Sequence, residues 1–150
     1  MKDLFKQLLV PVSGSESSVV AGKLAIQLAK EHGSLLVFVH VVDVAVRDRL
    51  ARLSGRTPDI VQRELEENGE RYLNYMVRLA EGEGVKAEKV LRVGVTDVET
   101  IAEAETSGAT LVVVGKPVYH GPRGEFFGRL ARHIIERIPC PVLVVKAKEE

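Results

Sequence analysis

The sequence predicts an α/β fold in which a parallel sheet carries helices on both faces. Short apolar runs typical of strands alternate along the chain with longer segments whose apolar residues recur at helical spacing. The run Leu111–Val114 has four apolar residues in succession, as expected for a strand buried on both faces. With 150 residues, 45% of them hydrophobic, and no internal repeat or linker, the chain is expected to form a single domain over residues 1–150.

The first three expected elements are a strand, a helix and a second strand. The strands correspond to Leu8–Val12 and Leu35–Val42. Between them, Ser15 can cap a helix that Gly33 ends. The apolar residues at helical spacing in that helix are Ala21, Leu24, Ala25, Leu28 and Ala29.

The middle of the chain contains a polar stretch and then a long helix. Residues Asp43–Thr57 are rich in arginine, and we expect a polar connection with room for a helical turn. Thr57 followed by Pro58 is typical of a helix start. Asn68–Gly69 is a weak point inside this helix, because glycine has low helix propensity. The apolar stripe comprises Val61, Leu65, Tyr72, Met76 and Leu79.

A charged strand and a further helix come next. Val85–Val93 alternates apolar and charged residues, which is typical of an exposed edge strand. Thr96 and Glu99 have the spacing of a capping box, so we expect a helix from there to about Gly108. With the elements near the C-terminus, the count becomes five strands and four principal helices.

The segment from Leu111 to Val145 joins two strands through a glycine-bearing loop and a helix. Gly115 ends the first of these strands, Gly128 precedes the helix, and Pro139-Cys140-Pro141 precedes the last strand. These residues and their spacing resemble the signature of the universal stress protein family, and the resemblance extends over the chain outside residues 43–57. It implies an open five-stranded parallel sheet of order 3-2-1-4-5, of the adenine nucleotide alpha hydrolase-like type.

The resemblance also implies a nucleotide site around residues 115–129. In nucleotide-binding members this loop has a glycine, two residues, a glycine, nine residues, a glycine and then Ser or Thr, and backbone N–H groups hold the phosphates. Here Val118 occupies the second glycine position and Arg129 the hydroxyl position. A β-branched residue resists positive φ and the close approach of a phosphate. The candidate nucleotide-binding residues are Pro11, Val12, Ser13, Val41, Val114, Gly115, Lys116, Val118, Arg123, Gly128, Arg129 and Leu130.

Two of these positions allow more than one interpretation. Ser13 stands where nucleotide-binding members usually carry Asp. Its hydroxyl can bond a ribose or a phosphate but is a poor cation ligand, and it can equally be a turn residue beside a helix cap. By resemblance, backbone groups near Val41 would face an adenine, and the alternative is ordinary strand core.

The loop itself is basic. Between Gly115 and Arg132, four cationic residues stand against Glu125, a net charge of +3; they are Lys116, Arg123, Arg129 and Arg132. Arginine forks can hold a phosphate-bearing ligand. The alternative is a solvated basic loop.

Composition argues against several other classes of protein. Lys plus Arg and Asp plus Glu both number 21, so no overall field attracts nucleic acid or an anionic membrane. Cys140 is the only cysteine, and neither a metal-ligand motif nor a catalytic arrangement is present in the sequence. The N-terminus lacks the features of a signal peptide, and no apolar run reaches the ~20 residues of a membrane span, so a cytoplasmic protein without membrane insertion is expected.

We therefore expect a universal stress protein-like regulatory or interaction module in stress response, with weak or no ATP binding and no enzymatic activity. The alternative is a module that binds an adenine nucleotide or another phosphorylated ligand through the 115–129 loop. The resemblance also implies a homodimer through the last strand, at Val142, Leu143, Val144 and Val145. The sequence does not identify a protein partner.

Overall fold

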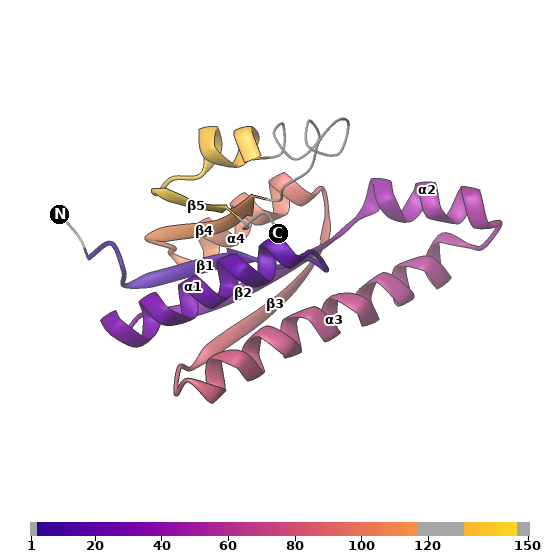
Figure 1. The fold of residues 1–150 in the computed structure, drawn as a ribbon. Coiled ribbons are helices and arrows are strands. Elements are labelled where there is room, and N and C mark those ends of the chain that lie inside the picture. The colour runs from indigo at the N-terminus through magenta and orange to yellow at the C-terminus, as the bar shows by residue number, and fades with distance from the viewer. Residues whose placement is uncertain (1–2, 117–130, 147–150) are drawn as a thin grey trace.

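The five strands of the computed structural model, which describes residues 3–116 and 131–146, form one parallel sheet (Figure 1). Their order is β3-β2-β1-β4-β5, which confirms the fold class and the strand order expected from the sequence. The pairing of β1 with β2 runs in register from Gln7 opposite Leu35 to Pro11 opposite Val39. The strand bounds are β1 Gln7–Pro11, β2 Leu35–Asp43, β3 Ala87–Gly94, β4 Leu111–Lys116 and β5 Val142–Lys146.

Helices cover both faces of the sheet. Their bounds are α1 Glu16–His32, α2 Val44–Ser54, α3 Pro58–Gly82 and α4 Thr96–Ser107, and residues 131–137 are also helical. Leu8 packs with α1 and α3 in one buried cluster, whereas Leu9 packs with α4 and Ile134 in a second. Adjacent residues of a strand point to opposite faces, so the nearly continuous apolar run of β1 supplies both clusters.

The expected start and end of α1 and the expected start of α3 are confirmed. Ser15 accepts a hydrogen bond from the backbone N–H of Ser18 at 3.4 Å, and Gly33 follows α1 with a left-handed φ of 68°. Thr57 caps α3. The helix runs through Gly69 without a break, and a Cβ there would lie 2.5 Å from Cδ2 of His40. Gly69 therefore makes room for a neighbouring side chain instead of weakening the helix.

The prediction of a polar connection over residues 43–57 is corrected by the structure, because most of these residues form the helix α2. Asp43 caps α2 by accepting hydrogen bonds from the N–H groups of Ala45 and Val46, and Gly55 ends it with a left-handed φ of 68°. Both signals are present in the sequence. Val46, Leu50 and Leu53 also have helical spacing, but four charged residues stand among them, and Ala51 is the only buried residue of the helix.

The start of α4 corrects a second expectation. Val95, not Thr96, occupies the N-cap position, and no side chain caps the helix from there. The Thr96 hydroxyl instead donates to Oδ2 of Asp43 at 2.6 Å, and Glu99 pairs with Arg92 at 3.1 Å. The side chains of Thr96 and Glu99 therefore bond residues of β2 and β3 and do not form a capping box.

Candidate functional site

The candidate site lies where the carboxyl ends of β1 and β4 meet the first turn of α1. A Cβ placed on Gly115 would lie 2.1 Å from the backbone oxygen of Ser17, so only glycine allows this approach of strand to helix. Ser13, two residues past the end of β1, hydrogen-bonds Ser18 of the same turn. The fold therefore brings Ser13 and Gly115 to one end of the sheet, which is where open parallel sheets bind ligands.

Serine hydroxyls fill the turn between β1 and α1. Ser13 Oγ lies 2.8 Å from Ser15 Oγ and accepts a hydrogen bond from the Ser15 N–H at 3.2 Å. Ser15 Oγ in turn lies 3.1 Å from Ser17 Oγ. Ser18 Oγ donates to the carbonyl of Ser13 and accepts from its N–H. Ser13 is therefore a turn residue whose hydroxyl is engaged by its own turn.

His40 supports this turn from beneath, a role that the sequence did not reveal. Its Nδ1 lies 2.7 Å from the carbonyl oxygen of Val12, so Nδ1 carries the hydrogen and donates it. The ring meets Tyr72 edge-on, with centroids 5.5 Å apart. Burial lowers the pKa of His40, and the hydrogen bond to Val12 opposes that shift only in part. The available signal was a polar residue inside an otherwise apolar strand.

Tyr72 ties α3 to the same turn. A Cβ on Gly14 would lie 2.8 Å from both Cζ and Oη of this tyrosine. The tyrosine was expected only as part of the apolar stripe of α3. It lies against the backbone of the β1–α1 turn and so helps to fix the position of Ser13.

The other described candidate residues divide between core and surface. Val12 and Val114 are buried, Pro11 is half-buried, and the Lys116 side chain is exposed. Val41 is half-buried on β2, opposite Arg92 of β3. Val41 therefore lies one strand farther from β4 than Ser13 does.

Part of the predicted nucleotide loop lies outside the described residues. This applies to the candidates Val118, Arg123, Gly128, Arg129 and Leu130. Their roles, and those of the basic loop as a whole, stay predictions from the sequence.

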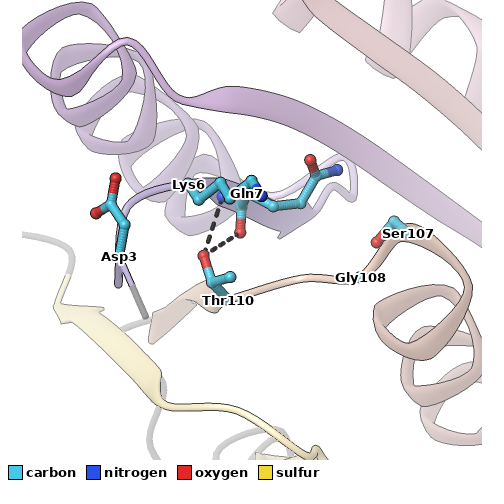
Figure 2. A pocket seen from close by; sticks show the side chains of 6 residues that line it. All are labelled: Asp3, Lys6, Gln7, Ser107, Gly108 and Thr110. Atoms are coloured by element: carbon cyan, nitrogen blue, oxygen red, sulfur yellow. Dashed lines mark hydrogen bonds between the residues drawn. The ribbon is translucent and has the colours of Figure 1, made fainter. Parts of the chain in front are cut away.

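A separate cavity of about 560 Å³ opens at the opposite, amino-terminal end of β1 and β4 (Figure 2). The Thr110 hydroxyl accepts from the Gln7 N–H at 2.9 Å and donates to the Gln7 carbonyl at 3.0 Å, which ties the two strands together. None of the predicted site residues lines this cavity. Its lining consists of Asp3, Lys6, Gln7, Ser107, Gly108 and Thr110.

The described residues offer neither a metal site nor a membrane-spanning helix. Within residues 3–116 and 131–146, no three His, Cys, Asp or Glu side chains are grouped so that they could hold a metal ion. In the same part of the chain, every helix is too short or too polar to cross a membrane.

The predicted dimer strand β5 lies at an edge of the sheet, bonded to β4 on one side. Leu143 is 37% exposed and Val144 is 39% exposed, whereas Val142 and Val145 are half-buried. The prediction that this strand pairs with a second copy is compatible with its position and stays a prediction.

Comparison with known proteins places this chain in a family. The model of the Universal stress protein family matches residues 4–146. Universal stress protein MJ0531 of Methanocaldococcus jannaschii is 32% identical over 145 residues, covering 97% of this chain and 84% of that protein. Universal stress protein YxiE of Bacillus subtilis is 27% identical over 148 residues, covering 95% of this chain and all of the relative.

Solved structures agree with this placement. A universal stress family protein from Burkholderia pseudomallei superposes with a TM-score of 0.77 at 25% identity, covering 98% of this chain and 100% of the other. The universal stress protein from Archaeoglobus fulgidus in complex with dAMP has the same fold, with a TM-score of 0.69 at 21% identity and coverage of 96% and 100%. The family match over nearly the whole chain confirms the resemblance seen in the sequence: this protein belongs to the universal stress protein family.

Proposed function

We propose that this protein is a homodimeric regulatory or interaction module in stress response, that it binds ATP weakly or not at all, and that it is not an enzyme. The observation that carries the proposal is the engagement of Ser13. Its hydroxyl is bonded to Ser15 within the β1–α1 turn, at 2.8 Å to Oγ and 3.2 Å to N–H. A nucleotide at this end of the sheet would have to compete with those bonds, and a hydroxyl offers a cation far less than a carboxylate does.

The proposed homodimer uses the exposed edge of β5. An edge strand presents unpaired N–H and C=O groups, and a second copy of the same strand satisfies them in an isologous interface. The exposed Leu143 and Val144 would then be covered by the partner strand.

Val144→Lys is expected to weaken this dimer, because the substitution places a charge in an apolar interface. Val93→Lys is a matched control, since Val93 is 41% exposed on β3, the other edge strand. Sedimentation at micromolar concentration measures the effect. Monomeric wild-type protein, or equal loss of the dimer in both variants, would contradict the proposal for β5.

Weak nucleotide binding is tested on freshly purified protein. Mass spectrometry of the small molecules released on denaturation is expected to find no stoichiometric adenine nucleotide. Calorimetric titration with ATP is expected to give little or no heat at low micromolar ligand. A bound nucleotide in stoichiometric amount, or low-micromolar affinity for ATP, would refute this part of the proposal.

The second candidate function is an adenine-nucleotide or phosphorylated-ligand binding module. It is supported by a structural neighbour in complex with dAMP and by another universal stress protein structure in complex with cAMP. The cationic side chains of Lys116, Arg123 and Arg129 would hold the phosphate.

This candidate predicts a specific pattern of affinities. Binding of a phosphorylated adenosine should weaken as salt rises, and adenosine itself should bind poorly, because the attraction is to the phosphate. Replacing Arg123 and Arg129 with Ala should abolish the difference between the two ligands. Equal affinity of the native protein for adenosine and its phosphates would exclude the basic loop as the phosphate site.

A further inference from the structure

A two-helix arm extends beyond the sheet (Figure 1). We call residues 44–68 the arm; they comprise α2, the short connection after it and the first part of α3. Figure 1 shows α2 and this part of α3 side by side, away from the strands. The part of α3 from Gly69 onward instead packs on the sheet, where Leu73 and Met76 are fully buried.

Only two residues of the arm, one on each helix, are buried. Ala51 of α2 and Val61 of α3 are both buried, yet neither belongs to the two clusters that flank the sheet. Arg47 donates to Gln62 across the two helices at 2.7 Å, and Arg56 pairs with Glu64. A short helix depends on tertiary packing for most of its stability, and Ala51 is the only buried residue of α2.

Three large apolar side chains of the arm face solvent. Leu53 is 79% exposed, Ile60 is 48% exposed and Leu50 is 37% exposed. Leu50 and Leu53 are three residues apart and therefore lie on one side of α2. Single exposed apolar residues are common on protein surfaces, but three on one small arm give another helix pair an apolar surface to cover.

The charges of the arm are divided between its two helices. Residues 44–57 contain four arginines and one aspartate, a net charge of +3. Residues 58–68 contain four acidic residues and one arginine, a net charge of −3. Within the described part of the chain, Arg49 and Arg52 make no ion pair, and Asp59 and Glu67 make none either. One arm is therefore complementary to another arm in the opposite orientation.

We propose that the arm is a second self-association surface, separate from β5, through which the arms of two copies form an antiparallel four-helix bundle. In this bundle α2 of each copy lies against α3 of the other, and Leu50, Leu53 and Ile60 of both copies form the shared core. Because each copy supplies one basic and one acidic helix, two-fold symmetry sets a basic helix against an acidic one in both contacts between the copies.

The charge distribution selects this pairing over others. Contact of α2 with α2 of the partner would set Arg49 and Arg52 against like charges. An anionic membrane gains nothing from the arm as a whole, since the charges of its two halves cancel. The arm extends beyond the end of β2, and β1 and β4 separate β2 from β5, so the two interfaces are distinct and together join dimers into larger assemblies.

Sedimentation of full-length protein over a range of concentrations tests the proposal. The wild type is expected to exceed the mass of two chains as concentration rises, and Leu53→Glu is expected to stop at two. Val98→Glu is the matched control, because Val98 is 54% exposed on α4 and should not alter assembly. If β5 does not form a dimer, the wild type is expected to be a dimer through the arm and Leu53→Glu a monomer. The experiment therefore tests the arm interface independently of the β5 interface. An unchanged mass for Leu53→Glu would overturn the arm interface.

Charge reversal tests the partner directly in the Val144→Lys background. One variant carries Arg49→Glu with Arg52→Glu, and the other carries Asp59→Lys with Glu67→Lys. Each alone is expected to be monomeric, and an equimolar mixture is expected to restore a dimer, because each basic helix then faces an acidic one. Circular dichroism checks that both variants remain folded. Failure of the folded variants to associate on mixing would rule out the pairing of α2 with α3.

Discussion

Asp43 and Thr96 join two helices through one carboxylate. Oδ1 of Asp43 accepts from the N–H groups of Ala45 and Val46 at the start of α2. Oδ2 accepts from the hydroxyl of Thr96 at 2.6 Å and from its N–H at 3.2 Å, at the start of α4. The aspartate thus satisfies otherwise unpaired N–H groups of both helices.

Replacement of Asp43 is expected to destabilise the protein. Asp43→Ala removes hydrogen-bond acceptors from two helix starts, and at about 1 kcal/mol for each the loss is about 2 kcal/mol. Asp43→Asn should cost less, because the amide oxygen can still cap α2 while the NH₂ group cannot accept from Thr96. Urea unfolding measures both. Asp48→Asn on the surface of α2 is the control, and an equal loss there would contradict the dual role of Asp43.

The same carboxylate predicts a dependence of stability on acid. Burial raises the pKa of Asp43, but the hydrogen bonds from Thr96, Val46 and Ala45 outweigh it, so the folded-state pKa is lowered. The stabilisation is therefore complete above the ordinary aspartate pKa of about 3.9 and is lost as pH falls through the lower folded-state value. The difference in unfolding free energy between wild type and Asp43→Asn should shrink from pH 6 to pH 3. A constant difference would show that the charge of Asp43 is irrelevant.

Gly115→Ala is expected to disturb the end of β4. The new Cβ would lie 2.1 Å from the backbone oxygen of Ser17, and a backbone atom cannot move aside without shifting α1. Overpacking of this kind typically costs about 1–3 kcal/mol. Gly82→Ala in α3 is the control, because its Cβ meets no atom within 4 Å and alanine favours a helix. If thermal unfolding shows Gly115→Ala to be as stable as Gly82→Ala or more stable, the close approach of Gly115 to the Ser17 backbone is contradicted.

His40 is expected to make stability fall on mild acidification. Burial lowers its pKa below the unfolded value of about 6.5, so the unfolded state binds the proton more readily. Stability is then greatest above the unfolded pKa and decreases as pH falls through 6.5 towards the folded pKa. His40→Gln should be less stable at pH 8 but should lose less between pH 8 and pH 5.5. If urea unfolding gives the same pH dependence of stability for both proteins, His40 is not the source of the loss of stability in mild acid.

The substitutions Val118→Gly and Arg129→Ser together are expected to improve ATP binding at least tenfold. Glycine allows the backbone conformation that valine resists, and serine supplies a hydroxyl close to a helix start that favours anions. Two or three hydrogen bonds to charged oxygens, at about 1.5 to 3 kcal/mol each, are enough for this gain after ordering costs. Calorimetry compares the double variant with the native protein. A folded double variant with unchanged affinity would show that these two residues are not the obstacle.

The sequence by itself determined the fold class, the family, both ends of α1 and the start of α3. These features depend on local signals: apolar runs such as Leu111–Val114, the cap at Ser15, the Thr57-Pro58 start, and the glycine spacing from Gly115 to Gly128. The strand order also followed from the sequence, through the family resemblance, since periodicity alone does not order parallel strands.

Tertiary structure decided what the individual polar residues do. Thr96 and Glu99 have the spacing of a capping box, but in the structure Thr96 bonds Asp43 and Glu99 pairs with Arg92. These partners lie on neighbouring strands and are far away in the sequence, so no local pattern reveals them. His40 holds the turn after β1 and Gly115 accommodates α1, and both roles arise from contacts between elements. The helix α2 was missed although Val46, Leu50 and Leu53 have helical spacing, because four charged residues lie among them and the packing that holds the helix, Ala51 and the cap at Asp43, is visible only in the structure.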